Sequence, residues 1–539
     1  MSDVSQSLGV GGPAAAPVRQ RTAPVRLRRG LSLGGLVILG SGGSIGTGVL
    51  FSSTGMAAVA GPAMIISWAI GGAIYMFIGL SYVDMGLRYP EAGGPARFSF
   101  YTHGSATNLI NAVCDLIWYL FIPAIEALAA MEGISHFDHG LLTSSGDPTT
   151  TGGLVAVALM ILFVPCNYFG IGVFHRLTNV LGGAKILLYL LLGAGVLVVF
   201  FSAQSFTHYG GFTPFGGSGI LAAIPLAMFS YGGARVMPDY AEEAHDPRDL
   251  KRSIPLAVGI QWALYVLFAV AFIAALGWSQ LSVSTGSWAG LAKTSGNPFV
   301  LLTTNRGASG LFAIALAVGI IGPAVDGYVY QGAGSRVLMA MGRSGYVSNR
   351  MQQLSRRHQV PIWGILVLMV VGAIVAFIAA PLPNIYSLID DSVAAGYVGF
   401  SAIPIAMLAV RRANNQPIEW TSALIAGIAF AGASLIVYWS GWPSVPYAAI
   451  LIAVGALIFG LTGRVGDWRH AGWYVAYILF LLLMTWIGSV GSQNVISFNL
   501  STAIVIAVAL LVFLPWGVAS RLSQPQTTAQ PPVDPAAET

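Results

Sequence analysis

The stretch Ile38-Leu-Gly-Ser-Gly-Gly-Ser-Ile-Gly-Thr-Gly-Val-Leu-Phe51 lies inside the longer apolar segment 31–59 and holds five glycines within nine positions. Each glycine costs roughly 1 kcal/mol relative to alanine in a helix interior. The stretch therefore predicts a helix that breaks in the middle of a membrane. Lipid cannot satisfy the backbone groups that a break frees, so the break must face protein, ions or substrate.

Two interpretations fit this break. The second half-helix would begin with free N–H groups and the positive end of its dipole, which suits a carboxylate. Alternatively, Gly42 and Gly46 have GxxxG spacing, which is typical of close helix packing. A second interruption, Ser230-Tyr-Gly-Gly233 in the apolar segment 217–243, favours a binding site. Two broken helices, the first and sixth spans, at matching positions of two five-helix halves are typical of inverted-repeat transporters.

The composition indicates a polytopic membrane protein, because 55% of the 539 residues are hydrophobic and only 8% are charged. Apolar runs of about 20 residues predict about 14 transmembrane helices. They are 31–59, 64–87, 106–133, 152–173, 177–202, 217–243, 254–276, 311–342, 360–380, 386–410, 421–439, 445–463, 471–490 and 499–521.

The basic residues support this count and give an orientation. With the N-terminus inside, 22 of the 25 Lys and Arg residues fall on the inner side. Both termini are thus expected in the cytoplasm, in disordered tails at 1–30 and 523–539. Spans one to ten, residues 31–410, would form the transport core, and 411–522 would hold accessory spans. The net charge of +5 lies in short loops between spans and does not indicate nucleic-acid binding.

Five stretches then point to a known family. They are Ile45-Gly-Thr-Gly-Val-Leu-Phe51, Tyr89-Pro-Glu-Ala-Gly-Gly94, Phe229-Ser-Tyr-Gly-Gly233, Asn297-Pro-Phe-Val300 and Ser335-Arg-Val-Leu-Met-Ala-Met341. In this order, on the predicted loops and spans, they resemble the amino acid–polyamine–organocation (APC) superfamily, the amino acid permeases. The resemblance implies an all-α, five-plus-five inverted-repeat core.

The resemblance also implies a substrate site at the two breaks. It places the substrate carboxylate at Gly46, Thr47 and Gly48, and the amino group at carbonyls near Phe229 and Ser230. The full set of predicted substrate-binding residues is Ile45, Gly46, Thr47, Gly48, Phe229, Ser230, Tyr231, Gly232 and Gly233.

Arg235 departs from the family pattern, which often has a glutamate just after the second break. A positive charge there disfavours cationic substrates. If the guanidinium points into the site, it can hold a second carboxylate through two parallel hydrogen bonds, and the substrate would be acidic. In the alternative, Arg235 points to the cytoplasm and pairs with Asp239, four residues on along the same helix face, which leaves a neutral substrate.

Lys185, Asp326 and Glu126 lie deep in predicted spans, where charge is expensive and usually functional. Lys185 is a candidate for proton coupling, and the alternative is a permanent ion pair with a buried carboxylate such as Asp326. Asp326 could also relay a proton or contact the substrate amine. Glu126 is a candidate for substrate charge or a gate, and its alternative is a static ion pair with an arginine.

The sequence thus predicts a secondary transporter of the cell membrane that imports an amino acid, most simply by proton symport. Its partners would be the amino acid, the proton and the lipid bilayer. The alternatives are an uncoupled exchanger, a membrane-embedded enzyme and a channel. No metal-ligand cluster, catalytic nucleophile with a base, or phosphate-binding loop occurs in the sequence, so no metal, cofactor, enzymatic activity or ATP drive is expected.

Overall fold

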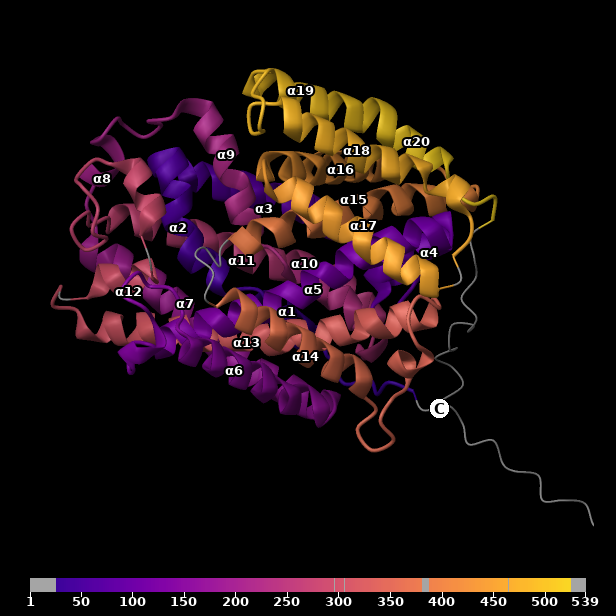
Figure 1. Ribbon diagram of the computed structural model, residues 1–539, viewed down its shortest axis with the longest axis horizontal. Coiled ribbons are helices and arrows are strands. Elements are labelled where there is room, and N and C mark those ends of the chain that lie inside the picture. Colours follow the sequence, from indigo (N-terminus) through magenta and orange to yellow (C-terminus); the bar gives the residue numbers. More distant parts are fainter. Residues whose placement is uncertain (1–25, 295, 305, 381–386, 464, 525–539) are drawn as a thin grey trace, which may run out of the picture.

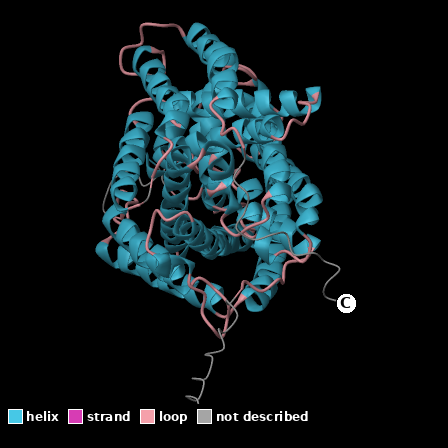
Figure 2. Cartoon of the chain, turned by 90° about the vertical axis from the view of Figure 1, so that its right-hand side faces the viewer, coloured by secondary structure: helices cyan, strands magenta, loops and turns pink. Residues whose placement is uncertain are grey.

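The computed structural model describes residues 26–294, 296–304, 306–380, 387–463 and 465–524. Within these ranges the chain is helical and contains no β-strand (Figure 2). The predicted tails fall mostly on residues 1–25 and 525–539, which lie outside the described ranges.

The α-helices follow one another along the whole described chain. They are α1 (Leu33–Gly42), α2 (Thr47–Ala60), α3 (Met64–Arg88), α4 (Phe98–His103), α5 (Ser105–Ile134), α6 (Thr150–Tyr168), α7 (Ile171–Phe200), α8 (Gln204–Thr207), α9 (Gly216–Met228), α10 (Gly233–Asp239), α11 (Leu250–Ala274), α12 (Pro298–Thr303), α13 (Ser309–Arg343), α14 (Ile362–Ala379), α15 (Ser387–Ala413), α16 (Trp420–Ser440), α17 (Ser444–Thr462), α18 (Gly472–Ile487), α19 (Phe498–Val508) and α20 (Leu514–Ala519).

Twelve segments of the described chain are long and apolar enough to cross a membrane. The first of them, Leu33–Arg88, is 56 residues long and contains α1, α2 and α3, and the apolar helix α18 is shorter than a usual span. The protein is therefore an integral, multi-pass membrane protein. The number of 14 crossings, the inverted-repeat relation and the orientation of the termini remain predictions.

Both glycine-rich stretches interrupt helices. α1 ends at Gly42 and α2 begins at Thr47. α9 ends at Met228 and α10 begins at Gly233. Gly46, just before α2, has no side chain to cap the helix, so the first N–H groups of α2 lack a local partner of that kind.

The interrupted helices lie at the centre of the helical body. α1 packs against α7 and α11, and α2 packs against α9, while the long helix α13 packs against α5 and α7. Helices α16 to α20 gather at one edge, in orange and yellow, away from α6 and α7 (Figure 1). Most of the helices around the two breaks therefore belong to the part of the chain before residue 344, and α15 and α16 also pack against α9.

Beyond α10, a buried ion pair ties the chain to the end of α13. Arg336 donates from Nε to Glu243 Oε2 at 2.7 Å and from Nη2 to Glu243 Oε1 at 2.8 Å. Burial raises the pKa of the Glu243 carboxyl, and the Arg336 guanidinium opposes that rise. The Glu243 carbonyl also accepts from the N–H groups of Gly30 and Leu31, which lead into α1.

Removing the charge of Glu243 should lower stability strongly. In Glu243→Gln the buried Arg336 loses its counter-ion, and breaking such a pair typically costs about 3–5 kcal/mol. We expect a clear drop in the melting temperature of the detergent-purified protein. Glu419→Gln, at an exposed position, is the matched control and should melt like the wild type. Equal melting of both variants would show that this ion pair does not hold the helices together.

Candidate functional site

The two breaks lie against each other and share one tyrosine. The hydroxyl of Tyr265, on α11, lies 2.8 Å from the Ser44 carbonyl in the first break and 2.8 Å from the Ser230 carbonyl in the second. A Cβ added to Gly48 would collide with the Ser230 hydroxyl. Glycine at position 48 is therefore required by the close approach of the breaks, and larger side chains are excluded.

The second break presents polar atoms and aromatic rings. Among the described residues, the buried Ser230 hydroxyl has no hydrogen-bond partner. Phe229 lies beside Trp118, with ring centroids 6.5 Å apart. Tyr231 instead packs between Trp68 and Tyr75 and donates to the Trp68 carbonyl at 3.2 Å. Tyr231 thus packs against α3, while the Ser230 hydroxyl, which has no partner among the described residues, lies at the contact between the two breaks.

The remaining predicted site residues, Ile45, Gly232 and Gly233, are tightly packed at the two breaks. Ile45 is fully buried. A Cβ on Gly232 would collide with the Tyr330 hydroxyl, and one on Gly233 would collide with the Gly40 carbonyl. These positions leave no room for side chains, which explains why glycine occupies both.

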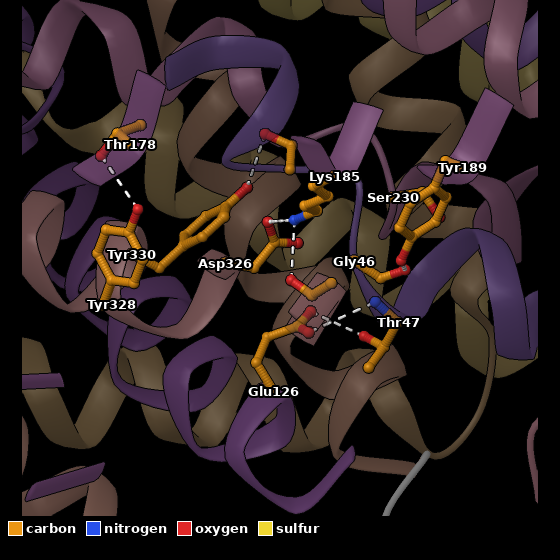
Figure 3. A network of polar contacts seen from close by, with 12 residues as sticks. Gly46, Thr47, Glu126, Thr178, Lys185, Tyr189, Ser230, Asp326, Tyr328 and Tyr330 are labelled. Atoms are coloured by element: carbon orange, nitrogen blue, oxygen red, sulfur yellow. Dashed lines mark hydrogen bonds and ion pairs between the residues drawn. The ribbon is translucent and has the colours of Figure 1, made fainter. Parts of the chain in front are cut away.

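Lys185 and Asp326 form a buried ion pair next to the first break. Lys185 Nζ, from α7, lies 2.5 Å from Asp326 Oδ1 and donates to the Gly322 carbonyl at 2.8 Å, both on α13 (Figure 3). The other Asp326 oxygen faces Gly46, where an added Cβ would collide with it. Lys185 is therefore paired with Asp326 at the edge of the first break, and its role in proton coupling stays a prediction.

Glu126 reaches the start of α2 from α5. Its Oε1 accepts from the Thr47 hydroxyl at 2.7 Å, and its Oε2 lies 3.4 Å from the Thr47 N–H (Figure 3). The carboxylate thus sits at the positive end of the α2 dipole. The alternative of a static ion pair with an arginine is wrong, because Glu126 is bonded to Thr47 and faces Lys185 and Asp326.

Of the two alternatives offered for Arg235, the ion pair with Asp239 is wrong. The fully buried Arg235 places Nη2 2.6 Å from Asp115 Oδ1 on α5. Its guanidinium lies over the rings of Tyr119, at 4.8 Å, and Phe400, at 5.2 Å. Asp239, the expected partner, instead accepts a hydrogen bond from the Tyr119 hydroxyl. Arg235 is thus enclosed by α5, α10 and α15 and does not reach the surface of the protein.

Comparison with known proteins identifies the chain. Residues 31–437 match the amino acid permease family. The chain belongs to this family. The match begins just before α1 and ends within α16, so it includes both breaks and all the residues described above.

Named relatives of the permease are amino acid transporters. The chain is 27% identical to the glutamate/serine transporter AimA of Bacillus subtilis, covering 92% of this chain and 94% of the relative. It is 26% identical to the aspartate-proton symporter of the same organism, over 91% and 96% of the two chains. The branched-chain amino acid permease BcaP of B. subtilis is 24% identical, over 81% and 94%. The protein is therefore a transporter of amino acids and not an enzyme.

The sequence missed several residues that organise the permease site. Tyr265 links the breaks, and Tyr330 contacts the Ser44 hydroxyl at 3.4 Å. Tyr189 donates to the Gly46 carbonyl at 3.0 Å (Figure 3). Asp115 neutralises Arg235. A polar side chain deep within an apolar span is the sequence feature that marks Glu126, and the same feature marks Asp115 and these tyrosines.

Proposed function

We propose that this permease imports an amino acid by proton symport across the cell membrane. The substrate α-carboxylate would bind at Gly46, Thr47 and Gly48, and the amino group near Phe229 and Ser230. The observation that carries the proposal is the buried Lys185–Asp326 ion pair beside the first break. A charge pair deep in a membrane protein, in direct contact with the binding backbone, can transmit a protonation change to the substrate.

Two further observations support this proposal. The N-terminus of α2 already holds a carboxylate, that of Glu126, which shows its preference for anions. One relative is named an aspartate-proton symporter. Residues 31–410 would form the transport core, because every residue named at the two breaks lies within that range, and 411–522 would be accessory.

Uptake into proteoliposomes tests the function. An amino acid panel is offered with an alkaline lumen and acidic medium, and again with equal pH on both sides. Symport predicts accumulation above the external concentration only with the pH gradient, in empty vesicles. Uptake that depends instead on amino acid preloaded inside, and ignores the gradient, would establish the alternative of uncoupled exchange.

The Arg235–Asp115 pair bears on whether the substrate is acidic or neutral. With Asp115 in place the guanidinium is neutralised, and this favours neutral amino acids. Yet Nε and Nη1 of Arg235 have no hydrogen-bond partner among the described residues, so two donor groups remain for a substrate carboxylate. Two relatives bear names that include glutamate or aspartate. Substitutions at Arg235 and Asp115 should therefore change competition by acidic and by neutral amino acids in opposite directions.

Asp115→Asn should shift competition toward acidic substrates. The substitution leaves an unbalanced guanidinium in a low-dielectric interior, where it attracts carboxylates more strongly. We expect aspartate to gain at least about tenfold over alanine as a competitor, which corresponds to about 1.4 kcal/mol. The measurement is inhibition of labelled uptake by aspartate, glutamate, alanine and leucine.

Arg235→Gln is the paired variant. If the wild type prefers acidic substrates, Arg235→Gln should lose that preference, and combined with Asp115→Asn it should cancel the shift. An unchanged ratio of aspartate to alanine inhibition in all three variants would show that Arg235 does not face the substrate and would leave a neutral amino acid as the cargo.

A further inference from the structure

Glu126 occupies the position where the proposed function places the substrate carboxylate. Its two oxygens lie at the hydroxyl and the N–H of Thr47, the first residue of α2. Glu126 is itself almost fully buried, and it reaches this position from a different helix, α5. A helix N-terminus attracts carboxylates in general, but here a specific carboxylate already fills it.

A second observation is that two carboxylates lie close together at the first break. An added Cβ on Gly46 would lie 2.9 Å from Glu126 Oε1 and would also collide with Asp326 Oδ2. Two carboxylates from α5 and α13 therefore converge on the same glycine, as Figure 3 shows. Lys185 is the cation that faces them, and it is bonded to Asp326. Fully ionised, the three side chains would carry one net negative charge.

The charged groups around Glu126 limit how the site can accept a substrate carboxylate. Asp326 from α13 and Lys185 from α7 are the charged side chains that face it within the described chain, and Tyr189 and Tyr330 are the neighbouring phenols. A substrate α-carboxylate at Thr47 would be a third negative charge in the same site. Like charges this close cannot all remain ionised in a low-dielectric interior. One carboxylate must therefore take up a proton or leave.

We infer that Glu126 is an internal competitor for the substrate carboxylate, and that it takes up the transported proton when the substrate displaces it from Thr47. The inference rests on the proposed carboxylate site at the first break. In the empty state Glu126 accepts from Thr47; in the loaded state the substrate α-carboxylate accepts from Thr47, and the protonated Glu126 is neutral. Lys185 keeps Asp326 ionised, so the exchanged proton belongs to Glu126. Substrate and proton thereby bind together, one of each.

Proton uptake on substrate binding tests this directly in the wild-type protein. Purified permease in weakly buffered detergent solution is mixed with L-aspartate or L-serine, and a pH indicator reports protons taken from solution. One proton per bound amino acid is expected. Serinamide, which lacks the α-carboxylate, should cause no proton uptake. Binding of the amino acid without proton uptake would overturn the inference.

Substitution of Glu126 separates competition from direct binding. Glu126→Gln mimics the protonated side chain, so it should bind the amino acid without proton uptake and more tightly than the wild type at alkaline pH. Wild-type affinity should fall about tenfold per pH unit where Glu126 is ionised, whereas the variant should show no such slope. Glu126→Asp retains the charge and should retain proton uptake.

The contrary outcomes are distinct from failure of the proposed function. Weaker binding in Glu126→Gln than in the wild type at both acidic and alkaline pH would mean that Glu126 holds the substrate and does not compete with it. Normal binding in Gly48→Leu, by contrast, would remove the substrate from this break altogether. Proton-independent import by the wild type would refute symport itself.

Discussion

Lys185→Ala is expected to abolish accumulation driven by a pH gradient while retaining slow exchange of amino acid across the membrane. Lys185 is buried and bonded to Asp326 and to the Gly322 carbonyl. Without it, Asp326 would be an unpaired charge in a low-dielectric interior, which proteins avoid by neutralising the group. Without the Lys185 ammonium, the neighbouring Glu126 would also stay protonated on both sides of the membrane. It could then no longer take up the transported proton, so coupling should be lost.

The measurement compares gradient-driven uptake with counterflow in the same proteoliposomes. Counterflow shows that the variant is folded and binds substrate. Lys293→Ala, at an exposed position outside the predicted spans, is the matched control and should accumulate normally. Undiminished accumulation by Lys185→Ala would show that the ion pair is structural and that coupling lies elsewhere.

Gly48→Leu should eliminate substrate binding and transport. The first turn of α2 lies directly against the second break, and any side chain at position 48 would collide with the Ser230 hydroxyl. A leucine must push the two breaks apart or fill the space between them. Overpacking alone costs typically 1–3 kcal/mol in a well-packed interior, so the protein is expected to remain assembled while the site is lost.

Gly183→Leu is the control for this substitution. Gly183 lies on α7, two residues from Lys185, and an added Cβ there would meet no atom within 4 Å. It should therefore bind and transport like the wild type. Equilibrium binding of labelled amino acid and elution in size-exclusion chromatography are measured for both variants. Wild-type affinity in Gly48→Leu would place the substrate elsewhere in the protein.

Local composition predicted the elements of this fold well. Glycines between Gly40 and Gly48 marked the first break, and the structure ends α1 at Gly42 and begins α2 at Thr47. Such signals are strong because a glycine cluster in a membrane-spanning segment has few stable alternatives. The predicted span 64–87 is likewise found as Met64–Arg88. How the spans pair in space could not be obtained from composition.

Site residues that stand out by their depth in an apolar span could be predicted from the sequence. Contacts that depend on how two helices pack together could not. Lys185 and Asp326 stood out as charges deep in apolar spans, and they are paired. Helical spacing offered Asp239 as one possible partner of Arg235, but that rule considers only one helix. Asp115 lies 120 positions away on α5, so its contact depends on how α5 and α10 approach each other. No local rule contains that information.

Lumenal pH in proteoliposomes during substrate entry tests the central claim most directly. Vesicles containing a trapped pH indicator, with equal pH on both sides and no amino acid inside, receive external amino acid. Proton symport predicts that the lumen acidifies as the amino acid enters, that a protonophore abolishes the signal, and that Lys185→Ala does not produce it. Entry of labelled amino acid without any change in lumenal pH would contradict the account.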